Sequence, residues 1–193
     1  MFEESLEALP DGRKALERWQ TPAEFIAKVE ELAAPIKSDK LFNRAEASFL
    51  LDAMVLAEFV KFRPTEQVRL VGQSAQWPDG QTGSPKASVN IEITEVLEEG
   101  RRRGDEYREG KEAKKETAED WRTRALAVPE RLDKAIERKI AKGYAGKCKL
   151  VVYLNMSTYS ILQKETEAAI AAVKAKYADN FDEICVLWQE KLL

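Results

Sequence analysis

The sequence predicts an α/β domain with a mixed central sheet flanked by helices, and three segments carry this prediction. Residues 88–96 alternate apolar and polar side chains, which is the pattern of a half-buried strand. Residues 149–188 run as apolar strand, helix and apolar strand, which favours a parallel pair joined by a crossover helix. Residues 44–62 indicate a helix whose apolar face contains Phe49, Ala53, Leu56 and Val60.

The N-terminal stretch, residues 1–40, is predicted to be a helical extension that packs on the main domain, residues 41–193. Segments 6–19 and 23–33 are rich in charge, Ala and Leu, and Thr21-Pro22 is typical of a helix start. We do not expect chemistry in this extension.

Pro64 ends the helix at 44–62, and after it the spacing of apolar residues changes from that of a helix to that of a strand. A short strand is expected at 67–71, followed by a turn-rich stretch at 72–85 and then the strand at 88–96. Residues 98–116 are almost entirely charged, so they are expected to form a projecting helix or a loop and no part of the core.

The C-terminal half is expected to continue as helix, strand, helix and strand. Helix resumes around Trp121 and again from Pro129 to Lys142, where Pro129 suits the first turn. Apolar strands follow at 149–154 and 183–188. The whole order is therefore helix, three strands, helix, strand, helix, strand, which is typical of an α/β domain.

Composition excludes several kinds of chemistry. The 193 residues include 31 basic and 34 acidic side chains but no histidine, which rules out Ser-His-Asp and Cys-His pairs and imidazole metal ligation. Two cysteines, Cys148 and Cys185, are too few for a closed zinc site and lie in apolar runs, so buried reduced thiols are expected. With no membrane-length apolar run and an acidic N-terminus, we expect a cytoplasmic protein without membrane partners.

Two carboxylates remain as the strongest chemical signal. Asp79 lies in the turn-rich stretch, and Glu92 follows thirteen residues later on the polar face of the strand at 88–96. Because strands this close in sequence usually pair as a hairpin, the two residues are expected on neighbouring strands. Mg²⁺ takes one or two protein carboxylates, so the pair predicts a site for Mg²⁺ or Mn²⁺.

Pro78-Asp79 and Glu92-Ile93-Thr94, together with the order of elements, resemble the PD-(D/E)XK nuclease superfamily, which has the restriction endonuclease-like fold. The resemblance covers residues 44–188 and implies that Asp79 and Glu92 bind the metal. It also implies a lysine two residues after the glutamate, which orients or deprotonates the attacking water. This sequence has Thr94 there.

Other residues are candidates for the missing or additional groups. Lys139 is the first candidate for a lysine supplied from elsewhere, and Lys86 is the second. Glu46 resembles an extra acidic position that some members of the superfamily use, but it is also placed to cap the helix at 44–62.

Residues 131–149 carry seven basic and two acidic side chains. This run is either a solvated helix face or a phosphate-contacting surface, since Lys and Arg supply most nonspecific affinity for nucleic acid. The candidate nucleic-acid-binding residues are Arg131, Lys134, Arg138 and Lys142.

The resemblance and the carboxylate pair predict a divalent-metal-dependent nuclease that hydrolyses phosphodiester bonds, with DNA as the expected partner. The alternative is a catalytically inactive member of the same fold that binds nucleic acid or protein. A third interpretation is an interaction protein driven by residues 98–116. Oligomeric state stays open, with a homodimer among the alternatives.

Overall fold

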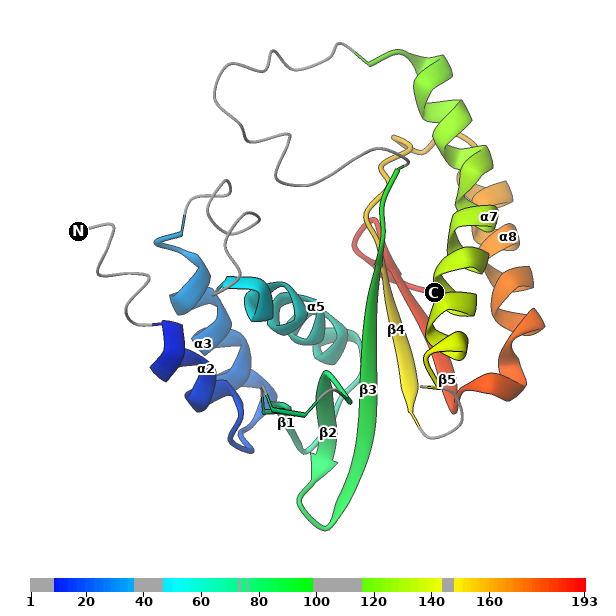
Figure 1. Cartoon of the computed structure of the whole chain (residues 1–193). Coiled ribbons are helices and arrows are strands. Elements are labelled where there is room, and N and C mark those ends of the chain that lie inside the picture. Colours follow the sequence, from blue (N-terminus) through cyan, green and yellow to red (C-terminus); the bar gives the residue numbers. More distant parts are fainter. Residues whose placement is uncertain (1–8, 37–46, 73, 76, 99–115, 144–147) are drawn as a thin grey trace. The chain divides into compact units, whose positions relative to one another are not determined.

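The computed structural model describes residues 9–36, 47–98, 116–143 and 148–193, apart from positions 73 and 76. The chain is mixed α/β, which confirms the predicted class, and it divides into two compact units (Figure 1). Among the described residues, the first unit holds those up to Ile93 and the second holds those from Thr94 onward.

The first unit contains three helices: α2 (Leu9–Leu16), α3 (Pro22–Ala33) and α5 (Ser48–Phe62). Thr21 caps α3 as the sequence indicates, because its hydroxyl accepts from the Glu24 N–H at 3.3 Å while Glu24 Oε2 accepts from the Thr21 N–H at 2.9 Å. Helix α2 packs on α3, and α3 packs on α5. The four residues predicted for the apolar face of α5 are all buried.

Three antiparallel strands complete the first unit: β1 (Gln67–Leu70), β2 (Gly80–Ser84) and most of β3 (Ala87–Val96). Strand β2 lies inside the turn-rich stretch and pairs with β3, as the expected hairpin requires. Gly80 of β2 allows α5 to approach the strand closely, because a Cβ at this position would lie 2.6 Å from Leu56 Cδ2. The helix therefore packs directly over the hairpin, on the side where Val68, Leu70 and Ile91 are buried.

The second unit is built on β4 (Lys149–Leu154) and β5 (Glu183–Trp188), which pair in parallel with Leu150 opposite Ile184. Helix α8 (Gln163–Lys176) connects them, so the predicted strand–helix–strand unit is confirmed. A short strand β6 (Lys191–Leu192) pairs antiparallel with β5. The last three residues of β3 also belong to this unit.

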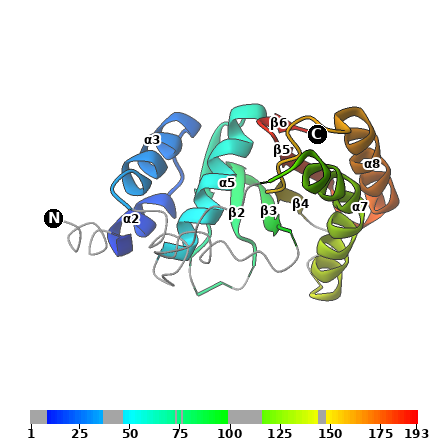
Figure 2. The same cartoon turned by 90° about the horizontal axis from the view of Figure 1, so that it is seen from above.

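Helix α7 (Ala118–Ala141) lies beside α8 (Figure 2) and is continuous. The prediction of a separate helix that starts at Pro129 is therefore wrong. The true start is a capping box in which Thr117 Oγ1 accepts from the Asp120 N–H at 3.3 Å and Asp120 Oδ2 accepts from the Thr117 N–H at 2.8 Å. Pro129 lies within the helix, where it removes one backbone donor without ending it.

Both cysteines are buried and reduced, as the sequence predicts. Cys148 precedes β4 and Cys185 lies within β5. Within the described residues, no helix combines the length and the apolar character that crossing a membrane requires.

Candidate metal site and nucleic-acid surface

The β2–β3 hairpin brings Asp79 to Glu92. The register sets Gly80 opposite Ile91 and Gln81 opposite Asn90, and Asp79 immediately precedes β2. The Asp79 N–H donates to the Ile91 carbonyl at 3.1 Å, and Asp79 Oδ2 accepts from the Ile93 N–H at 2.7 Å. Asp79 is thus bonded to the residues on both sides of Glu92, which confirms that the two acidic residues lie on neighbouring chain segments.

Glu92 is almost fully buried, with an exposed fraction of 2%. Glutamate is depleted in strands and is seldom fully buried, so this position is unusual for a simple strand residue. Glu92 is therefore not a solvent-facing side chain.

The hairpin face that carries Glu92 is polar. A row of side-chain hydrogen bonds crosses the three strands on this face: Gln81 Nε2 donates to Asn90 Oδ1 at 2.9 Å, and Arg69 Nη2 donates to Gln81 Oε1 at 2.7 Å. The Arg69 guanidinium also lies 5.0 Å from the centre of the Trp19 ring. The buried Glu92 therefore lies on a hydrogen-bonded polar face of the hairpin.

The residues present fit a hard divalent cation. Mg²⁺ bonds to one or two protein carboxylates and keeps water or substrate oxygens for its other positions. Asp79 and Glu92 supply that number and type of ligand. Within the described part of the chain, no group of three or more His, Cys, Asp or Glu side chains is placed to hold a metal ion.

The lysine candidates lie in different places. Thr94 is on β3, on the same face as Glu92 by alternation, and is partly exposed. Lys86 is exposed at the hairpin tip, about 20 Å from Glu92 along the strand at roughly 3.3 Å per residue. The hairpin therefore excludes Lys86 as the substitute lysine. Lys139 lies on α7 in the second unit, and Glu46 lies outside the described residues.

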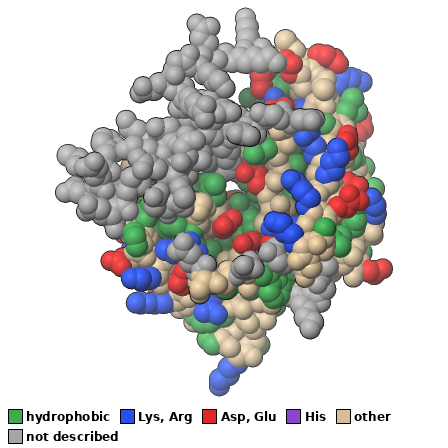
Figure 3. All heavy atoms as spheres, in the orientation of Figure 1, with side chains coloured by type: hydrophobic (Ala, Val, Ile, Leu, Met, Phe, Trp, Pro, Cys, Tyr) green, Lys and Arg blue, Asp and Glu red, His purple; other side chains and the backbone are tan. Residues whose placement is uncertain are grey.

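The four predicted nucleic-acid-binding residues occupy one face of α7 and its C-terminal cap. Arg131, Lys134, Arg138 and Lys142 are spaced by three, four and four positions, which places them on a single stripe. Lys134, Arg138 and Lys142 are exposed, and Arg131 is half-buried. Figure 3 shows basic side chains along α7. We call this stripe the basic row.

Two acidic residues of the same helix segment, Asp133 and Glu137, point toward the end of α8. Asp133 accepts from Lys176 Nζ at 2.7 Å, and the Tyr177 hydroxyl lies 2.9 Å from Asp133 Oδ1 and 3.0 Å from Glu137 Oε1. The Lys176 hydrogen bond holds the pKa of Asp133 below its ordinary value. Asp133 and Glu137 are therefore engaged toward α8, whereas Glu130 forms an ion pair with Lys134 of the basic row, and its charge offsets part of the field of that row.

Sequence reasoning missed Arg124, which is only 7% exposed. It forms ion pairs with Glu98 and Glu116, and its Nη1 donates to the Ser157 carbonyl at 2.7 Å. Burial lowers the pKa of Arg124, but hydrogen bonds to Glu116 and Glu98 outweigh this effect and raise it above its ordinary value. The available signal was its position one turn before Val128, on the apolar side of α7.

Comparisons of the chain with protein-family models, with curated proteins and with solved structures give no match.

Proposed function

We propose that this protein is a divalent-metal-dependent nuclease that hydrolyses phosphodiester bonds in DNA. The observation that carries the proposal is the pairing of Asp79 with the backbone on both sides of the buried Glu92. The order α5, β1, β2, β3, α7, β4 is also the order of elements on which the resemblance to PD-(D/E)XK nucleases rests.

In this proposal Asp79 and Glu92 hold Mg²⁺ or Mn²⁺, which supplies Lewis-acid stabilisation of the phosphate and a more acidic water. The Ile93 N–H orients the Asp79 carboxylate through its 2.7 Å hydrogen bond. Thr94 lies where the family has lysine, and its hydroxyl can hydrogen-bond to water but carries no positive charge. In the second unit, the basic row on α7 supplies nonspecific affinity for nucleic-acid phosphates.

The test is nicking of supercoiled plasmid with Mg²⁺ or Mn²⁺. The parent protein should nick, chelator should stop the reaction, and Asp79→Asn and Glu92→Gln should abolish it. Glu95→Gln is the matched control, because Glu95 lies on the same strand but alternates to the other face and accepts from Asn155 Nδ2 at 3.1 Å. A parent protein inactive on plasmid, single-stranded DNA and RNA across divalent metals would overturn the proposal.

A second candidate function is favoured by Thr94 and by the location of Lys86 at the hairpin tip. Without a lysine from the hairpin, the same fold serves as a nucleic-acid-binding module without catalysis. In that case, calorimetry should detect no Mg²⁺ or Mn²⁺ binding, while DNA binding should survive chelator and weaken steeply as salt rises. Thr94→Lys separates the two candidates further, since restoring the family lysine should increase nicking only if the carboxylates hold a metal.

A further inference from the structure

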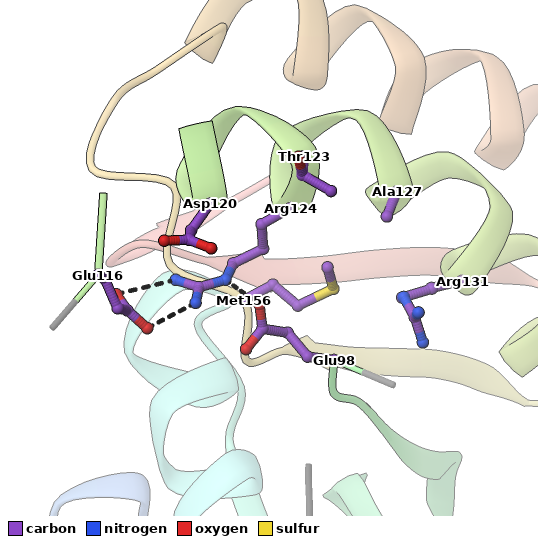
Figure 4. Close-up of a pocket in the computed structure, with 8 residues that line it drawn as sticks. All are labelled: Glu98, Glu116, Asp120, Thr123, Arg124, Ala127, Arg131 and Met156. Carbon is purple, nitrogen blue, oxygen red and sulfur yellow. Dashed lines mark hydrogen bonds and ion pairs between the residues drawn. The ribbon is translucent and has the colours of Figure 1, made fainter. Parts of the chain in front are cut away.

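The second unit contains a pocket of about 380 Å³ beneath the N-terminal half of α7 (Figure 4). Its volume falls within the range of small-molecule sites. Three carboxylates, those of Glu98, Glu116 and Asp120, line it, and the Arg124 guanidinium lies among them. We call this part the acidic end.

The carboxylates of the acidic end have fixed orientations. Glu116 accepts from Arg124 Nη2 at 2.6 Å and from Trp121 Nε1 at 2.8 Å, and Glu98 pairs with Arg124 Nε. Asp120 is held by the capping box at Thr117. Each carboxylate oxygen has two lone pairs, so these groups form a preorganised wall of hydrogen-bond acceptors.

Arg131 lines the opposite end of the pocket, and Met156 and Ala127 lie between the two ends (Figure 4). Arg131 is also the first member of the basic row. Thr123, Ala127 and Arg131 follow one another at four-residue spacing, so the pocket and the basic row lie along the same helix face. A strand bound to the basic row therefore reaches the pocket at Arg131.

We propose that this pocket receives one unpaired nucleotide of a bound single strand and selects cytosine over thymine. The exocyclic amino group of the base points to the acidic end, Met156 and Ala127 contact the base, and Arg131 binds its phosphate. Carboxylates accept from the cytosine N4 amino group, whereas thymine presents carbonyl oxygens that a carboxylate repels. The inference rests on nucleic acid being the substrate class of the proposed function.

The first experiment measures fluorescence anisotropy of labelled twelve-residue oligo(dC) and oligo(dT) in chelator, so that hydrolysis plays no part. Oligo(dC) should bind about tenfold more tightly, which is the discrimination expected of one good base contact. Equal affinity for the two oligonucleotides would overturn the pocket inference while leaving the nuclease proposal intact. Failure to bind either oligonucleotide would overturn the nucleic-acid function and the inference together.

A second arm identifies the source of the nucleotide. Deoxycytidine monophosphate lacks the neighbouring phosphates that the basic row would bind, so it should compete for the pocket far more weakly than oligo(dC). If the mononucleotide binds as tightly as the oligonucleotide, the pocket serves a free nucleotide and the assignment to a bound strand is wrong.

Matched variants test the location. Thr123 is exposed and lines the pocket, so Thr123→Trp should fill it and remove the preference for oligo(dC) while oligo(dT) binding stays within about twofold. Leu126→Trp adds the same bulk on α7 outside the pocket, at a position 65% exposed, and should keep the full preference. A preference that survives Thr123→Trp, or that Leu126→Trp also removes, would overturn the assignment.

Discussion

The hairpin of the first unit and the Arg124 cluster of the second unit gather carboxylates in different ways. In the hairpin, backbone hydrogen bonds set Asp79 beside Glu92, and the two residues are thirteen positions apart. In the cluster, one buried guanidinium joins Glu98 to Glu116 and also bonds to the Ser157 carbonyl. The comparison shows that strand register can position a pair of acids locally, whereas a side-chain cluster depends on distant segments meeting at one cation.

The largest expected effect comes from removing that cation. Arg124→Met should lower the free energy of unfolding by about 3 kcal/mol, because it removes the buried cation that pairs with Glu98 and Glu116 and donates to the Ser157 carbonyl. This loss is at the low end of the range for removing one partner of a buried ion pair, because the Glu98 and Glu116 side chains are 29% and 35% exposed. Urea unfolding measures it. The exposed neighbour variant Arg122→Met should stay within about 0.5 kcal/mol; equal losses for the two variants would contradict the role of the cluster.

Two glycines with positive φ, one in the hairpin of the first unit and one after α7 in the second, allow the backbones of the two units to be compared. Gly83 has φ of +107° and a Cβ there would lie 2.4 Å from the Ala87 carbonyl oxygen, while Gly143 has φ of +77° and a Cβ there meets nothing within 4 Å. Gly83→Ala should therefore cost about 2 kcal/mol through clash and strain, and Gly143→Ala about 1 kcal/mol through strain alone. Chemical denaturation compares them. Similar losses would mean that the hairpin turn relaxes around the added methyl group.

The hairpin was largely predictable because its information is local. The alternation through Val89, Ile91 and Ile93 identifies β3, and a short connection implies antiparallel pairing, which brings Asp79 to Glu92. The bounds of β2 were not predicted, because Gly80 and Gly83 lack strand propensity, although the expected hairpin implied a strand next to the one at 88–96. Gly80 is explained only by tertiary structure, since Leu56 of α5 occupies the space of its missing side chain.

The second unit was predictable where apolar runs are long and unpredictable where side chains meet across the chain. The bounds of β4 and β5 agree with the predicted 149–154 and 183–188, because buried parallel strands are continuous apolar segments. By contrast, Pro129 suggested a helix start that packing overrides. The partners of Arg124 come from three separate segments, and no spacing in the sequence relates them.

Asp79 gives the next smaller effect and tests how far the hairpin depends on a side chain. Asp79→Ala removes the carboxylate that accepts from the Ile93 N–H at 2.7 Å and should cost about 1.5 kcal/mol. Asp79→Asn keeps an oxygen acceptor and should cost about 0.5 kcal/mol. Urea unfolding together with amide exchange of Ile93 measures both. If the alanine variant exchanges at the parental rate, the hairpin register is held by the backbone alone.

The smallest effect concerns pH and the acidic residues that α7 turns to α8. Because the Lys176 hydrogen bond lowers the pKa of Asp133 from 3.8, the folded state favours the ionised carboxylate. This contribution is present above pH 3.8 and is lost as the pH falls through the lowered pKa. Asp133→Asn should therefore flatten the fall in stability below pH 4, by less than about 1 kcal/mol for so exposed a pair. Thermal unfolding between pH 2 and pH 6 measures it, with Glu165→Gln on α8 as the exposed control. If the stability of Asp133→Asn falls below pH 4 as steeply as that of the parent protein, the α7–α8 contact does not depend on this ion pair.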